Sequence, residues 1–385
     1  MQSTQKISIY PFLIIGFVTG TLLALLATHI SQFAYGVVPN TKQYAFMHIL
    51  FYCWIGSYGY MFLLAYPDAQ SLKRLIFITL IPSFISSLPN YWESYHTFAQ
   101  MALMFSSAYA LNVFHMHYQK QGFQFSYQTL FYAVWDSFVK MFIAFCFSIL
   151  CWIILFLASE LFSLTGVVFL KNLIRHSWFA ILSTSVFTSI GLYIATKTNN
   201  VVRNTRIVLI TICRYLLIPL AIVSILFVIF AIVLAYQHHL HFTRQYIFSS
   251  IALLSVLFIN GVYQEGSIEQ PYPIFLLWIC RVFLWITPIF PLLALYAAYY
   301  HSDNNIMSNG FNTNNTPFII NAVILLVYTL CYAVIAIRRQ KPWLKSIERV
   351  NVALGIFLIF ATLVTTYPAF VKHFPQPKPR HFIAH

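Results

Sequence analysis

The chain has 385 residues, of which 60% are hydrophobic and only 8% are charged, and its net charge is +14 at pH 7. An average soluble chain carries about 25% charged residues, so this composition excludes a water-soluble fold with a polar surface. The Lys and Arg residues lie in joints between apolar runs rather than along one basic face, which argues against nucleic-acid binding.

Apolar runs recur along the whole chain at a length suited to a bilayer, whose hydrocarbon core takes about 20 apolar residues per helix. We expect an all-α bundle of about eleven transmembrane spans joined by short polar segments. The third span is the shortest, reaching only about 20 Å as a helix, and it contains Pro82. The predicted spans are 9–29, 45–66, 75–88, 97–114, 137–158, 178–196, 207–236, 246–263, 274–300, 318–337 and 352–370.

Counts of Lys and Arg in alternate joints predict the orientation, because positively charged loops stay on the cytoplasmic side of a membrane. With the N-terminus inside, the inner joints hold fourteen Lys and Arg residues and the outer joints hold seven. The sequence therefore predicts a cytoplasmic N-terminus, one transmembrane domain over residues 1–371 and a short basic tail over 372–385. The expected partner is the lipid bilayer, with anionic headgroups at the basic joints.

Neither the cysteines nor the histidines form a pattern typical of a metal site. All six cysteines lie inside apolar runs without a CxxC pair, where a thiol acts as a small apolar group. His115 and His117 follow the fourth span, and His238, His239 and His241 follow the seventh, on the opposite face in this orientation. No thiolate or carboxylate stands at ligand spacing beside them. We expect interfacial histidines, no metal and no cofactor.

The ninth span contains two prolines, Pro288 and Pro291, inside an apolar helix. Each proline removes a backbone donor and frees a carbonyl that a neighbouring group must satisfy. A broken helix of this kind lines the site of many transporters. A packing kink is the alternative, and we favour it because proline is common in membrane helices.

The joint before the ninth span is polar and has no basic residue of its own. Arg281 lies in the first half of that span, where an unpaired guanidinium costs about 2.5 kcal/mol or more. Two interpretations have equal weight: Arg281 pairs with Glu265 or Glu269, or the joint is solvated and Arg281 reaches the headgroups. The candidate polar site comprises Asn260, Tyr263, Gln264, Glu265, Glu269 and Arg281.

Two other groups of polar residues are interpreted as structural. Asp136 and Lys140 stand four residues apart at the start of the fifth span, where an acid near a helix N-terminus and an i,i+4 ion pair are both favourable. The sixth span carries five hydroxylated residues, which allow helices to approach closely and favour helix packing over a polar path. These residues are Ser183, Thr184, Ser185, Thr188 and Ser189.

The sequence contains none of the common catalytic motifs. It has no GxSxG, HExxH or phosphate-binding glycine loop, and its eight acidic residues are scattered. No catalytic residue is therefore predicted, and an enzyme is the less favoured class.

Three stretches of the chain form an ordered set of motifs: Leu161-Phe162-Ser-Leu-Thr-Gly166-Val-Val-Phe169, Arg214-Tyr-Leu-Leu-Ile-Pro219-Leu220, and Asn260-Gly-Val-Tyr263-Gln264-Glu265-Gly266 followed by Pro291-Leu-Leu-Ala-Leu-Tyr296. Together they resemble domain-of-unknown-function family 4153, a family of bacterial membrane proteins. The resemblance covers about residues 130–340, and the order and spacing of the stretches strengthen it. The chain departs from the family pattern after the ninth span, where His301-Ser-Asp303 and an asparagine-rich loop replace an expected arginine and a Tyr-Gly-Leu-Thr stretch.

The resemblance implies a multi-pass protein of the bacterial inner membrane and supplies no reaction. The hypothesis is a transporter-like or accessory and assembly component of that membrane. The alternative is a membrane enzyme that acts on a lipid or polyprenyl-linked substrate.

Overall fold

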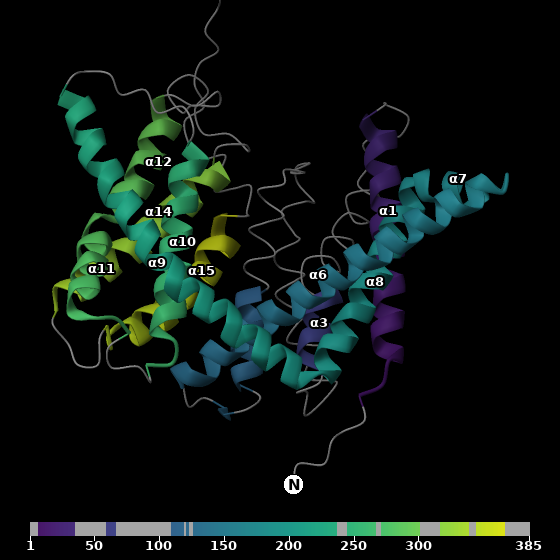
Figure 1. The fold of residues 1–385 in the computed structure, drawn as a ribbon, viewed down its shortest axis with the longest axis horizontal. Helices are drawn as coiled ribbons and strands as arrows, with labels where there is room; N and C mark the ends of the chain where they lie inside the picture. The colour runs from purple at the N-terminus through teal and green to yellow at the C-terminus, as the bar shows by residue number, and fades with distance from the viewer. Residues whose placement is uncertain are drawn as a thin grey trace, which may run out of the picture. The chain divides into compact units, whose positions relative to one another are not determined.

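The computed structural model describes residues 7–34, 59–66, 109–118, 121–122, 126–236, 245–266, 271–300, 316–338 and 344–365. These residues are almost entirely helical and include no strand, which confirms the all-α class (Figure 1). Six of the described helices are long and apolar enough to cross a membrane. They correspond to the predicted spans from the fifth to the tenth.

Parts of the predicted topology fall outside the described residues. The predicted span 75–88 falls outside the described residues, as do most of 45–66 and 97–114. The count of about eleven spans and the cytoplasmic N-terminus stay predictions. The chain forms two compact units, Met1–Ser94 with Met104–Arg206, and Tyr95–Leu103 with Ile207–His385.

In the first unit, helix α1 (Tyr10–Ala34) packs on α8 (Ser177–Lys197) through residues that have almost no side chain. The motif is Gly16-Phe-Val-Thr-Gly20, a GxxxG pattern that brings two membrane helices into backbone contact. A Cβ atom on Gly16 would lie 2.5 Å from Ser189 Oγ, and one on Gly20 would lie 2.9 Å from Leu182 Cα. Ser185 donates a hydrogen bond of 2.8 Å to the Gly16 carbonyl. The hydroxylated face of α8 therefore serves helix packing.

The opposite side of α8 packs on α6 (Tyr127–Leu164) with the same kind of close approach. A Cβ atom on Gly191 would lie 2.7 Å from the Cα atom of Ala144. Trp152 of α6 donates its indole N–H to Thr184 Oγ1 at 2.9 Å. Helix α7 (Phe169–Arg175) connects the end of α6 to the start of α8 and contacts both.

Helices α6 and α9 (Asn199–Tyr236) have 38 residues each, so each is about 57 Å long and exceeds the 30 Å hydrocarbon core. Their N-terminal ends are joined by an ion pair between Arg206 and Asp136. The Arg206 guanidinium also lies 4.5 Å from the centre of the Tyr132 ring. Asp136 was expected to support its own helix beside Lys140; the structure also gives it this partner on α9.

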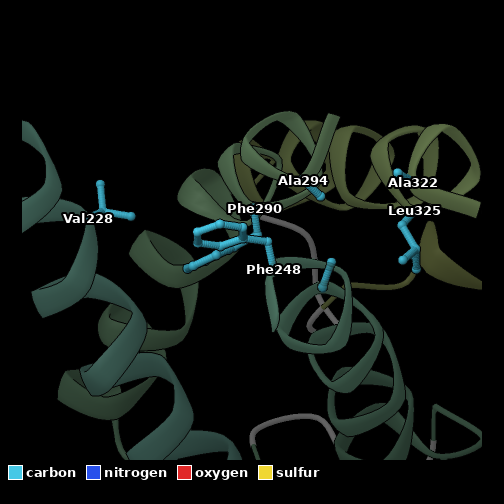
Figure 2. Close-up of a cluster of buried hydrophobic side chains, with 7 residues drawn as sticks. Val228, Phe248, Phe290, Ala294, Ala322 and Leu325 are labelled. Carbon is cyan, nitrogen blue, oxygen red and sulfur yellow. The ribbon is translucent and has the colours of Figure 1, made fainter. Parts of the chain in front are cut away.

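The second unit is built from α10 (Gln245–Tyr263), α11 (Ile274–Ile286), α12 (Ile289–Tyr300), α14 (Thr316–Ile337), α15 (Ile347–Thr365) and the rest of α9. Helix α14 is central, because it contacts α10, α11, α12 and α15. Figure 2 shows part of the core between these helices. The core residues are Val228, Phe248, Ala252, Phe290, Ala294, Ala322 and Leu325.

The GxxxG contact leads to a stability prediction. Gly20→Leu places a branched side chain against the α8 backbone, and we expect this overpacking to lower the free energy of unfolding by about 1–3 kcal/mol. The measurement is thermal unfolding of the full chain in mild detergent. The control is Phe17→Leu, because Phe17 lies on the exposed face of α1. Equal melting temperatures for the two variants would contradict the proposed contact.

Candidate functional site

Most of the predicted polar site lies where α10 ends. Asn260 and Tyr263 occupy the last turn of α10, and Gln264 and Glu265 follow directly. Arg281 lies on α11, and Glu269 falls outside the described residues. The structure therefore brings together part of the set.

Helix α10 ends in a turn with two left-handed residues. Gln264 has a φ of +53° and donates its backbone N–H to the Asn260 carbonyl at 2.9 Å. This is the usual way to cap the last carbonyls of a helix, but a residue with a Cβ is strained there. Gly266 has a φ of +79°, and a Cβ at this position would lie 2.7 Å from the Tyr263 hydroxyl and 2.9 Å from Glu348 Oε1. Only glycine fits such a close approach.

Asn260 belongs to a closed ring of hydrogen bonds that joins three helices. Its side-chain amide donates to the Tyr332 hydroxyl of α14 at 2.8 Å, and also to the Val256 carbonyl. The Tyr332 hydroxyl donates to Asn351 Oδ1 of α15. Asn351 Nδ2 then donates to Asn260 Oδ1 at 2.5 Å, which completes the ring. Tyr332 is 2% exposed and the two asparagines are half-buried, so the Tyr332 hydroxyl is the enclosed member of this polar triad.

A second cluster lies beside the triad and includes a carboxylate. The Tyr263 hydroxyl donates to Glu348 Oε1 at 2.6 Å, and Lys345 Nζ lies 2.7 Å from the same oxygen. Tyr263 is the largest fully buried side chain of the described residues, at 2% exposure. Leu344, immediately before Lys345, has a φ of +58° and is, with Gln264, one of two residues with a Cβ and a positive φ in the described part of the chain. The joints before α15 and after α10 are thus both strained where they flank this carboxylate.

Four of these residues were missed by the sequence analysis: Tyr332, Lys345, Glu348 and Asn351. Tyr332 and Asn351 are 72 and 91 residues from Asn260, and Glu348 is 85 residues from Tyr263. Asn351, a polar residue directly before the predicted span 352–370, is the signal that could have indicated them.

Arg281 is half-buried on α11, and its guanidinium lies 5.5 Å from the centre of the Trp278 ring. A cation over an aromatic face is stabilised by the ring quadrupole. The pairing of Arg281 with Glu265 or Glu269 stays a prediction.

Arg214, from the second stretch of the family resemblance, fixes the segment before α11. Its guanidinium donates to the Pro271 carbonyl and lies 5.6 Å from the centre of the Tyr272 ring. The Tyr272 hydroxyl donates back to the Arg214 carbonyl. Burial raises the pKa of Tyr272 above its usual range, so this phenol keeps its proton and remains a donor.

Helix α11 ends at Ile286 and α12 begins at Ile289, so Pro288 lies between the two helices and Pro291 lies in the first turn of α12. Pro288 lacks the N–H that would bond the Leu284 carbonyl, and Thr287 Oγ1 donates to that carbonyl at 2.8 Å. Pro291 likewise leaves the Thr287 carbonyl without its usual partner, and the Phe290 N–H donates to it at 3.2 Å. Both prolines are buried, and Thr287 is 1% exposed. The two carbonyls that the prolines free are therefore bonded within the chain, beside buried side chains.

The described part of the chain contains no group of three or more His, Cys, Asp or Glu residues able to hold a metal ion. His115 and His117 are buried, at 5% and 1% exposure, rather than at an exposed interface. The cluster at 238–241 lies outside the described residues.

Comparison of the chain with protein-family models, with curated proteins and with solved structures gave no match. The resemblance to domain-of-unknown-function family 4153 stays a prediction.

The polar triad predicts a specific loss of stability. Tyr332→Phe keeps the buried ring and removes the hydroxyl, which leaves the half-buried Asn351 and Asn260 each without one partner. We expect unfolding to become easier by about 1–3 kcal/mol, measured as thermal unfolding in detergent. Tyr215→Phe is the control, because Tyr215 is 74% exposed. If Tyr332→Phe were as stable as the control, the triad would contribute nothing to the fold.

A second prediction concerns the break. Thr287→Val has nearly the same shape but no hydroxyl, so the Leu284 carbonyl loses its donor. The expected cost is again about 1–3 kcal/mol. Thr188→Val is the matched control, because the Thr188 hydroxyl donates to a carbonyl, that of Thr184, inside a regular helix. A penalty no larger than that of the control would show that the Thr287 hydroxyl is not needed to satisfy the break.

Proposed function

We propose that this protein is a multi-pass component of a bacterial cytoplasmic membrane, with about eleven spans and a cytoplasmic N-terminus, that has an accessory or assembly role. The six long apolar helices of the described residues support the membrane placement. The proposal includes the relationship to domain-of-unknown-function family 4153.

The choice between transport and assembly depends on the helix break between α11 and α12. A transporter site at a broken helix needs unwound backbone that lines a cavity and offers carbonyls to an ion or substrate. Here the two freed carbonyls are bonded within the chain, and the surrounding residues Pro288, Phe290 and Pro291 are buried. These features favour a packing kink over a transport site.

The polar network at the ends of α10, α14 and α15 also favours a structural role. The amide and hydroxyl groups of Asn260, Tyr332 and Asn351 bond one another in a closed ring. The Glu348 oxygen that faces Tyr263 also binds Lys345. Groups committed to such bonds would have to break them before binding a substrate. The network is thus suited to fastening three helices.

Water access to the break tests the proposal. A cysteine introduced at Ile289 should react with a membrane-impermeant thiol reagent no faster than the wild-type cysteines, in vesicles of either orientation. Gln128→Cys, at an exposed position near the start of α6, is the reactive control. Rapid labelling at position 289 would place water at the break and would favour a transporter instead.

Topology is tested by reporter fusions to the full membrane-inserted chain. A fusion after Lys197 should report the cytoplasm, and one after Lys378 should report the periplasm. A periplasmic signal after Lys197 would contradict the orientation.

A further inference from the structure

The connection between α6 and α8 carries an exposed apolar surface that does not belong to the bundle core. Its residues, called here the apolar hook, are Leu161, Phe162, Leu164, Val167, Val168 and Phe169. Leu164 is 84% exposed and Phe169 is 70% exposed. Contiguous apolar surface of this kind marks a site that another molecule or a membrane covers.

The hook is an ordered structure. The Val167 N–H donates to the Phe162 carbonyl at 3.0 Å, and the Gly166 N–H donates to the Ser163 carbonyl at 3.1 Å. With Gly166 at a φ of +83°, this is the two-bond cap that ends many helices. Lys171 then forms an ion pair of 3.1 Å with Glu160, which ties α7 back to the end of α6. The apolar residues are therefore held in a fixed turn.

The register between α6 and α8 gives the level of the hook. The two helices run antiparallel, because Ala144 faces Gly191 and Trp152 bonds to Thr184. Extending this register places Ser177, where α8 begins, beside about residue 158 of α6, so the last six or so residues of α6 extend about 9 Å further. Figure 1 shows α7 following the end of α6.

Helix α8 has 21 residues and is about 31 Å long, which matches the hydrocarbon core. If α8 spans that core, Leu161 lies about 4–5 Å and Leu164 about 9 Å beyond its edge, and α7 connects this end of α6 back to the start of α8. The headgroup layer occupies about 5–8 Å on each side. The hook therefore lies at the level of the headgroups.

The chemistry of the segment fits that level. The hook continues the lipid-facing surface of α6, where Ile154 and Leu157 are exposed. Its apolar residues are followed by Lys171, Arg175 and His176, of which Arg175 and His176 are exposed. Apolar groups followed by cations match the boundary between acyl chains and phosphates. The apolar surface alone would also suit contact with a second protein. The level of the hook and the cations that follow it favour the membrane surface.

We propose that the α6–α7 connection is an interfacial anchor, in which the apolar hook enters the headgroup layer and Arg175 binds phospholipid phosphate. This inference rests on the membrane placement proposed above and adds a lipid-binding site to it. It predicts that a segment between two spans lies in the membrane surface rather than in water.

The test measures depth in the full chain, reconstituted in vesicles of phosphatidylethanolamine and phosphatidylglycerol. A solvatochromic amino acid is introduced by codon suppression at Val168, and separately at Ile154 and Gln128 as references. Quenchers are lipids that carry a spin label on the headgroup or in the middle of the acyl chain, and iodide in the water. The probe at 168 should be quenched most by the headgroup label, the probe at 154 by the mid-chain label, and the probe at 128 by iodide.

Each outcome separates the two proposals. Quenching at 168 mainly by iodide, or by none of the three, would overturn the anchor while leaving the membrane placement intact if position 154 still reports the acyl chains. Quenching at 154 by iodide would overturn the membrane placement itself.

The phosphate contact is tested by native mass spectrometry of the wild-type chain, Arg175→Gln and Arg175→Lys. Arg175→Gln should lose bound phosphatidylglycerol, and Arg175→Lys should retain it, because a cation is needed. Equal lipid retention by all three would overturn the role of Arg175.

Discussion

The constraint that governs this structure is that a backbone N–H or carbonyl in an apolar environment must find its partner within the protein. A chain with 8% charged residues has few side chains to offer, so regular helices satisfy most of these groups. The exceptions are instructive. At the break before α12, the hydroxyl of Thr287 replaces the donor that Pro288 lacks. At the end of α6, Gly166 adopts the left-handed conformation that caps the last carbonyls.

The first unit is held together by close helix packing, and the second unit by hydrogen bonds between polar side chains. In the first unit, small residues allow backbones to touch, as Gly16 and Gly20 do against α8. Membrane helices gain little from hydrophobic burial against one another, so such contacts supply dispersion energy instead. In the second unit, Asn260, Tyr332 and Asn351 hold three helices through directional bonds that also fix their register. Both devices produce a specific arrangement in a uniformly apolar chain.

The sequence predicted the helical class and the approximate positions of the described spans, because runs of apolar residues are a local property. It underestimated the lengths of α6 and α9. Their polar ends, from Tyr127 to Asp136 and from Asn199 to Arg206, lie outside the apolar runs and are stabilised by the ion pair between Asp136 and Arg206. That contact joins residues 70 apart, which periodicity cannot reveal. The GxxxG motif of α1 is a local pattern in the sequence, but only the structure identifies α8 as the helix that it contacts.

The same limit applies to the candidate site. The polar joint after α10 was evident because Asn260 and Glu265 interrupt an apolar sequence, but the bonds of Asn260 and Tyr263 go to α14 and α15.

The closed ring of hydrogen bonds between Asn260, Tyr332 and Asn351 has a further consequence for how such a site can change over generations. Replacing one of the three residues leaves each of the other two without one of its hydrogen-bond partners. Each single substitution is therefore harmful, even where a simultaneous replacement of all three by apolar residues would be tolerated. In an alignment of relatives, positions 260, 332 and 351 should therefore vary jointly, and this covariation would mark the ring in sequences for which no structure exists.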